Sequence, residues 1–187
     1  MQVLPSIGMV AIGGSAGSLP VLVQLLNSLH QPLKWPVVII LHRLKNVQSE
    51  LHNLLSVKIP ITEPVDKEPV ESRVYLAPQN YHLLIEEDRT FSLDYSEPLH
   101  FSRPSIDVSF FSAAAIYRRH ALGILLSGAN KDGAAGIQRI ISHGGTGIVQ
   151  QPDTALFSNM PQAALDLSPQ VQAMTIDGIT GYLNQLR

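Results

Sequence analysis

The sequence predicts an α/β fold: a doubly wound, mostly parallel sheet with an antiparallel hairpin extension and helices on both faces. Uninterrupted apolar runs indicate strands that are buried on both faces of a parallel sheet. Such runs occur at residues 9–12, 37–41, 122–126 and 147–149. Other segments have apolar residues every three or four positions, a spacing typical of helices. These predicted helices cover residues 19–29, 48–56, 105–117, 134–142 and 161–167.

Residues 57–98 break this alternation, because prolines punctuate the first part and the apolar runs that follow are short. Short strands are predicted at 74–76, 82–85 and 91–93. The charged stretch 86–89 between the last two strands predicts a hairpin turn. We therefore expect this region to extend the parallel sheet with an antiparallel hairpin.

Composition narrows the function. A chain of 187 residues with 45% hydrophobic residues can bury one sizeable core, so we expect one domain over residues 1–187. The formal net charge of −2 and the scattered basic residues argue against a nucleic-acid partner. With no apolar run of roughly 18 residues and no signal-peptide pattern, we expect a cytoplasmic protein that is not embedded in a membrane. The absence of cysteine rules out a disulfide framework, thiolate zinc sites and a cysteine nucleophile.

Ser15 stands on a predicted tight turn between the first strand and the first helix, within Gly-Gly-Ser-Ala-Gly at 13–17. Such a turn exposes the serine hydroxyl beside the N–H groups that begin a helix, as a serine nucleophile requires. The same turn can also bind phosphate. However, a dinucleotide fingerprint would lack two of its three glycines, and no P-loop Gly-Lys-Ser or Gly-Lys-Thr occurs. The next strand also ends at His42 instead of an acidic residue, so nucleotide binding is disfavoured.

Three predicted strands end close to a serine, a histidine and an aspartate. Ser15 follows the first strand, His42 follows the second, and Asp132 lies in the loop after the strand at 122–126. The carboxyl ends of parallel strands share one crevice, so these side chains should meet there as nucleophile, general base and orienting carboxylate. Their order along the chain differs from that of the α/β-hydrolases, which predicts a hydrolase with its own topology.

Several further motifs follow in the chain. They are Ile-Gly-Gly-Ser-Ala-Gly-Ser at 12–18, Ile-Leu-His at 40–42, Tyr-Leu-Ala-Pro at 75–78, His-Leu-Leu-Ile at 82–85, Arg-Pro-Ser-Ile-Asp-Val at 103–108, Leu-Leu-Ser-Gly-Ala-Asn-Lys-Asp-Gly at 125–133, Val-Gln-Gln-Pro at 149–152 and Asn-Met-Pro-Gln-Ala-Ala at 159–164. At these motifs the chain resembles, over nearly its whole length, the catalytic domain of the chemotaxis protein-glutamate methylesterases, the CheB family. The resemblance places the family's nucleophile, base and acid on Ser15, His42 and Asp132.

This resemblance implies a serine hydrolase that removes methyl esters from glutamate side chains of chemoreceptors, and in many members also deamidates receptor glutamines. Its expected partners are the methylated cytoplasmic regions of chemoreceptors. Typical members carry an N-terminal receiver domain, for which this chain has no room before its first strand. We therefore expect any control to come from a separate protein, such as a response regulator.

Four further residues form the expected substrate or oxyanion neighbourhood: Ala16, Arg103, Ala129 and Met160. Ala129 departs from the family's usual loop before the aspartate, which bears on substrate preference more than on the reaction. Arg103 suits an acidic-substrate contact and a brace for its helix equally well. Met160 and His82 suit structural roles better than chemistry.

Two other functions stay open. One is a non-catalytic or regulatory signalling module of the same fold, and the other is an esterase for small molecules. An intact set of three catalytic groups favours an enzyme over a binding module. No cofactor is expected, and the histidines show no ligand spacing, so no metal is expected either.

Overall fold

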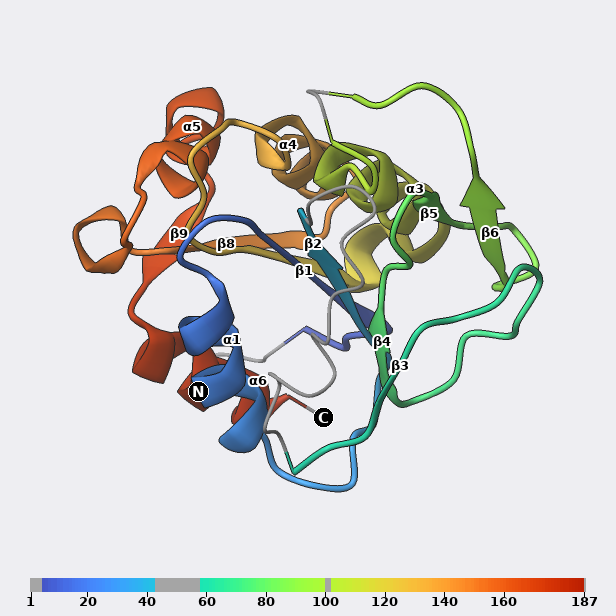
Figure 1. The fold of residues 1–187 in the computed structure, drawn as a ribbon. Coiled ribbons are helices and arrows are strands. Elements are labelled where there is room, and N and C mark those ends of the chain that lie inside the picture. Colours follow the sequence, from blue (N-terminus) through green and yellow to red (C-terminus); the bar gives the residue numbers. More distant parts are fainter. Residues whose placement is uncertain (1–4, 43–57, 100–101, 187) are drawn as a thin grey trace.

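A computed structural model describes residues 5–42, 58–99 and 102–186, and Figure 1 shows its strands and helices. The strands are β1 (Met9–Gly14), β2 (Val37–Leu41), β3 (Ile61–Thr62), β4 (Val74–Leu76), β5 (His82–Ile85), β6 (Phe91–Asp94), β7 (Ala121–Leu125), β8 (Thr146–Gln150) and β9 (Gln172–Met174). The α-helices are α1 (Leu19–Asn27), α3 (Ile106–Tyr117), α4 (Ala134–Ser142), α5 (Asn159–Leu167) and α6 (Ile176–Gln185), with short 3₁₀ turns at Arg118–His120 and Pro152–Thr154. The helix predicted at 48–56 lies outside the described residues.

Seven of these strands form one parallel sheet in the order β3-β4-β2-β1-β7-β8-β9. The chain begins in the middle of the sheet at β1, passes to β2 and the β3 edge, and returns to the other side of β1 at β7. Such a reversal of direction opens a crevice at the carboxyl ends of the central strands. The doubly wound, mostly parallel fold that the sequence predicts is confirmed.

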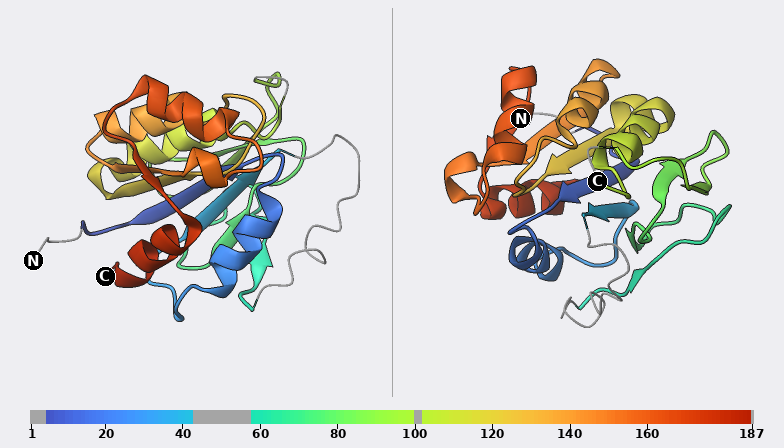
Figure 2. Two further views of the ribbon diagram at one scale, coloured as in Figure 1. Left: turned by 90° about the vertical axis from the view of Figure 1, so that its left-hand side faces the viewer. Right: turned by 45° about the horizontal axis from the view of Figure 1, so that its top comes forward.

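Each face of the sheet has its own apolar core. On β1, Val10 and Ile12 belong to the core shared with α1 and α6. Met9 and Ala11 alternate with them and belong to the core shared with α3, α4 and α5. Figure 2 shows these two helical layers on opposite sides of the sheet. Because helices cover both faces, the central strands are apolar at successive positions instead of alternating with polar residues.

The antiparallel hairpin differs from the prediction in its attachment. Within the described part of the chain, β5 and β6 pair only with each other as a separate two-stranded sheet, whereas β4 joins the parallel sheet beside β2. Leu83 of β5 and Phe91 of β6 lie in the same core as Phe110 of α3. The hairpin therefore buries its apolar side against a helix, not by extending the sheet. The structure also contains β3, β9 and α6, which the sequence analysis does not predict.

Candidate active site

Ser15 lies directly after β1 on a compact turn. Its backbone N–H donates to the carbonyl of Ser127 at 2.9 Å, and its carbonyl accepts from the hydroxyl of Ser18 at 2.7 Å. Gly17 adopts a positive φ of 78°, which returns the chain into α1. The side chain of Ser15 is half-buried and that of Ala16 is exposed. The predicted strand–turn–helix is thus confirmed, and its backbone is tied to the loop after β7.

His42 lies directly after β2, the neighbour of β1. Gly14 and Leu41 are partners in the β1–β2 register, so Ser15 and His42 both leave the sheet at the same edge. The N–H of His42 donates to the carbonyl of Gly14 at 3.3 Å. Its imidazole Nε2 lies 2.7 Å from Asp132 Oδ2, and its Nδ1 lies 3.5 Å from Asn130 Nδ2.

Asp132 precedes α4, yet its carboxylate occupies the N-terminus of α3. Oδ1 accepts from the Ser105 hydroxyl at 2.9 Å and the Asp107 N–H at 3.0 Å. Oδ2 accepts from the Ile106 N–H at 2.8 Å, in addition to its contact with His42. Ser105 is the N-cap of α3, but its hydroxyl makes no capping bond within that helix and donates to Asp132 instead. The fully buried carboxylate is therefore held on every side by donors.

The charge of Asp132 follows from these contacts. Burial raises the pKa of this carboxyl, but hydrogen bonds from His42 and from the N–H groups of Asp107 and Ile106 outweigh burial and hold the pKa below its ordinary value of 3.8. Asp132 is then ionised at neutral pH and can only accept hydrogen bonds. Nε2 of a neutral His42 must carry the proton in their contact, which leaves Nδ1 as the basic nitrogen.

The structure brings two of the three predicted catalytic side chains into contact and places the third on the adjacent turn. His42 and Asp132 meet directly, as predicted. Among the described residues, no hydrogen bond joins Ser15 Oγ to His42, so that contact stays a prediction. Contacts between a serine and its base are often loose without substrate and tighten when substrate binds.

The four neighbourhood residues fall into two groups. Ala16 and Ala129 are exposed on the loops after β1 and β7, at the same carboxyl edge of the sheet as Ser15. Met160 is fully buried, and its side chain fills the space beside Gly128, where an added Cβ would lie 2.5 Å from Met160 Sδ. Arg103 donates to the carbonyls of Tyr95 and Ser96 and lies over the Tyr95 ring at 3.9 Å. These contacts favour a packing role for Met160. They favour a structural role for Arg103 over contact with an acidic substrate.

Sequence reasoning missed the groups that hold the Asp132 carboxylate and the loop after β7. Ser105 and Asn130 belong to motifs singled out above. The contact of Ser105 with Asp132 joins residues 27 positions apart, and that of Asn130 with the Asp132 N–H is a local turn of the loop. Ser127 Oγ bonds the carbonyl of Ala16, and its N–H donates to Gln150 Oε1. The available sequence signal was that the polar residues Ser127 and Gln150 directly follow apolar runs; both are buried in the structure.

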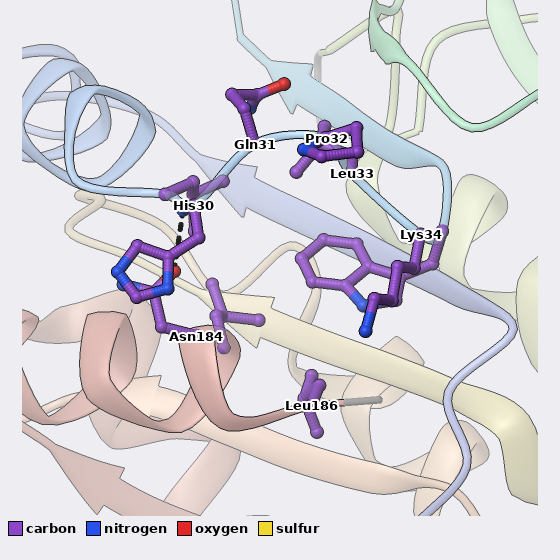
Figure 3. Close-up of a pocket in the computed structure, with 10 residues that line it drawn as sticks. His30, Gln31, Pro32, Leu33, Lys34, Asn184 and Leu186 are labelled. Carbon is purple, nitrogen blue, oxygen red and sulfur yellow. Dashed lines mark hydrogen bonds between the residues drawn. The ribbon is translucent and has the colours of Figure 1, made fainter.

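A separate pocket of about 260 Å³ lies away from these residues (Figure 3). The loop between α1 and β2 and the end of α6 line it, and the N–H of His30 donates to Asn184 Oδ1 at 2.8 Å. That loop leads into the amino end of β2, whereas His42 follows its carboxyl end. None of the predicted site residues lines this pocket.

Over residues 5–42, 58–99 and 102–186, no group of three or more His, Asp or Glu side chains is arranged to hold a metal ion. None of the helices in these ranges combines the length and apolarity needed to cross a bilayer.

The parallel α/β fold carries a histidine in contact with a buried aspartate beside a serine turn at its carboxyl edge, which is the layout of a hydrolytic enzyme. The family model for the CheB methylesterase matches residues 10–183. The chain therefore belongs to the CheB methylesterase family.

Individual relatives agree. A Leptospira interrogans protein, provisionally named a protein-glutamate methylesterase/protein-glutamine glutaminase, is 39% identical over 173 residues, which cover 91% of this chain and 90% of that protein. A Geobacillus kaustophilus protein-glutamate methylesterase/protein-glutamine glutaminase is 32% identical over 189 residues, covering 97% of this chain but 54% of the longer relative. The crystal structure of the Thermotoga maritima CheB methylesterase catalytic domain superposes with a TM-score of 0.89 at 26% identity, covering 96% of this chain and 98% of that domain.

Proposed function

We propose that this chain hydrolyses methyl esters of glutamate side chains in chemoreceptor cytoplasmic regions, with Ser15, His42 and Asp132 as catalytic triad. The observation that carries the proposal is the 2.7 Å contact between His42 Nε2 and the ionised Asp132, one strand away from the Ser15 turn. It orients an imidazole whose remaining nitrogen can take a proton. Family membership and the names of the relatives supply the ester as substrate.

The first half of the reaction forms an acyl-enzyme. Ser15 Oγ attacks the carbonyl carbon of the ester while its proton passes to His42 Nδ1, and Asp132 stabilises the imidazolium. The carbonyl oxygen becomes an oxyanion, for which we propose the loop amides around Ala16 and Ala129 as donors. The tetrahedral intermediate then breaks its bond to the methoxy oxygen, which takes the proton from His42 and leaves as methanol.

The second half releases the carboxylate. A water molecule attacks the acyl carbon and gives its proton to His42 Nδ1. The bond to Ser15 Oγ breaks, the serine regains the proton, and the product is a glutamate side chain. With a glutamine substrate the same steps expel ammonia instead of methanol, which is the glutaminase reaction in the names of the relatives.

The alternatives are a small-molecule esterase and a non-catalytic module of the same fold. A binding module does not require a buried carboxylate that three donors hold against a histidine. The intact pair therefore favours an enzyme. A separate regulator docking near Ser15 is also part of the proposal.

Mass spectrometry of the substrate tests this function. A methyl-esterified receptor cytoplasmic fragment is incubated with the chain, and its peptides are compared before and after. We expect each esterified glutamate to lose the mass of one methylene group, and unmodified receptor glutamines to change to glutamates if deamidation also occurs. Unchanged peptides, together with rapid hydrolysis of small esters, would favour the small-molecule alternative. Unchanged peptides without ester hydrolysis would favour the non-catalytic module.

A further inference from the structure

At the N-termini of α3 and α4, an aspartate from each segment accepts hydrogen bonds from the backbone N–H groups of the other. Asp132, before α4, accepts from the N–H of Asp107 at 3.0 Å. Asp107, the second residue of α3, returns the interaction: its Oδ1 accepts from the N–H of Gly133 at 2.9 Å and of Gly136 at 2.6 Å. Gly133 directly follows Asp132 in the chain and is the N-cap of α4. Each carboxylate thus satisfies N–H groups that begin the other helix.

Close packing between α3 and α4 leaves Asp107 and Asp132 little freedom to move. Gly133 has a φ of 94°, and a Cβ there would lie 2.6 Å from Leu125 Cδ1 and 2.7 Å from Ile106 Cγ2. At Gly136, a Cβ would lie 2.5 Å from Phe110 Cβ. α3 and α4 therefore approach through glycines, and the hydrogen bonds of Asp107 set where residue 132 sits relative to α3.

We propose that Asp107 is a positioning residue for the triad: its carboxylate fixes the backbone at Gly133 and so holds the Asp132 carboxylate against His42. This role rests on the proposed function, because it assigns Asp107 to the geometry of that reaction. Asp107 acts through Asp132: its N–H donates to that carboxylate, and its own carboxylate accepts from the N–H of Gly133, the next residue in the chain. A misplacement of about 1 Å in a catalytic group can cost on the order of 10²-fold in rate.

A purely structural role makes a different prediction. An acidic residue in the first turn of a helix stabilises that helix whatever lies nearby. If this were all, removing the side chain would lower thermal stability and leave the reaction of the remaining folded protein unchanged.

The chain offers a matched control for this distinction. α6 also begins with Ile-Asp, and its Asp177 is likewise the second residue of the helix. Asp177 is exposed and lies on the opposite face of the sheet, where its carboxylate accepts a hydrogen bond from Gln24 Nε2 at 3.3 Å. Asp107→Ala, Asp107→Asn and Asp177→Ala are compared with the natural chain by thermal unfolding, by kcat and KM on methylated receptor fragment, and by the pH profile of kcat/KM.

We expect Asp107→Ala to lower kcat by about 10- to 100-fold with little change in KM. The acid limb of its pH profile should move to lower pH, because a displaced Asp132 stabilises the His42 imidazolium less. Asp107→Asn should stay within about threefold of the natural chain, since its carboxamide oxygen can still accept from both amides. Asp177→Ala should match the natural chain in kcat and in pH profile.

Two results would overturn the proposal. One is an Asp107→Ala protein that melts at lower temperature but keeps the natural kcat and pH profile. The other is an Asp107→Asn protein as impaired as the alanine variant. Hydrogen-bond acceptance from the Gly133 and Gly136 amides would then not account for the role of Asp107. If the alanine variant does not fold, Asp107→Ser replaces it, since its hydroxyl is too short to reach both amides.

Nuclear magnetic resonance separates this proposal from the proposed function. At fixed pH, the ring ¹⁵N and Nε2–H signals of His42 report whether Asp132 still accepts from Nε2, with no substrate present. We expect these signals to shift in Asp107→Ala and to stay in place in Asp107→Asn and Asp177→Ala. If the natural chain cleaves no ester, the proposed function fails, and these signals alone decide the role of Asp107: unshifted signals in the alanine variant would refute it.

Discussion

At the residue scale, the contact of His42 with Asp132 determines which imidazole nitrogen can take part in the reaction. His42 Nε2 faces Asp132 at 2.7 Å, so Nδ1 is the nitrogen that can receive the Ser15 proton. The serine hydroxyl is a weak nucleophile without that base, and the base is poorly oriented without the carboxylate. The three side chains should therefore act as one unit.

Their single and double variants test this unity. We predict that Ser15→Ala and His42→Ala each lower turnover on methylated receptor fragment by on the order of 10⁴-fold or more, and that the double variant is no worse than either. Asp132→Ala should cost less, because the serine and imidazole remain. Steady-state kinetics of the four proteins measures this, and additive losses would contradict a shared proton-transfer step.

Activity should depend on pH through His42. Turnover should fall as the pH is lowered, because a protonated imidazole cannot accept the serine proton. The profile of kcat/KM between about pH 5 and 9 measures this dependence. A flat profile over that range would exclude a histidine base.

Stability should depend on pH through Asp132. Its folded pKa is lowered, because the hydrogen bonds from His42 and the α3 amides outweigh the opposing effect of burial. The ionised carboxylate therefore stabilises the fold above the unfolded pKa, and this contribution is lost as the pH falls through the lower, folded pKa. We predict that the free energy of unfolding in urea decreases below about pH 4, and that Asp132→Asn flattens this decrease. Parallel curves for the two proteins would contradict it.

At the element scale, the loops after β1, β2 and β7 are held by contacts that the sequence pattern cannot predict. Apolar runs predict the central strands to within a residue or two, because full burial leaves a strong signal. β9 is three residues long and mostly exposed, and α6 contains Gly178 and Gly181, so neither has a strong pattern. The support of Asp132 by Ser105 and by the α3 amides depends on tertiary packing, which spacing along the chain does not encode.

Two glycine substitutions test the close approach of α3 and α4. Gly133→Ala should lower the free energy of unfolding by about 1–3 kcal/mol and reduce activity, because φ is positive and the new Cβ meets Leu125 and Ile106. Gly181→Ala is the control: it lies within α6, and apart from its own helix backbone and chain neighbours no atom of the described residues lies within 4 Å of the added Cβ. It should raise stability by about 0.5–1 kcal/mol and leave activity unchanged. Urea unfolding with activity assays compares them, and equal effects would contradict the packing argument.

At the scale of the whole molecule, the fold places the site where the direction of strand order reverses. Ser15 follows β1, His42 follows β2, and the loop with Asp132 follows β7, so three central strands supply one group each. The strand-end rule predicts this gathering from the sequence, and the His42–Asp132 contact confirms it for two residues. The predicted antiparallel hairpin is present, but it pairs apart from the parallel sheet, because burial of Leu83 and Phe91 against α3 leaves no periodic signal.

Control by phosphorylation can be tested on the same chain. The match to the CheB methylesterase family spans residues 10–183, and the fold is similar to that of a CheB methylesterase catalytic domain. We predict that acetyl phosphate leaves the esterase activity of the purified 187-residue chain unchanged. An assay with and without the phosphodonor measures this, and strong activation would show that the chain itself responds to phosphorylation.

The most direct measurement of the central claim is methanol release from a methylated receptor cytoplasmic fragment, comparing the natural chain with Ser15→Ala. The natural chain should release methanol in step with the loss of ester groups, and Ser15→Ala, with an unchanged fold by circular dichroism, should release essentially none. Equal methanol release by the two proteins would contradict the assignment of Ser15 as nucleophile.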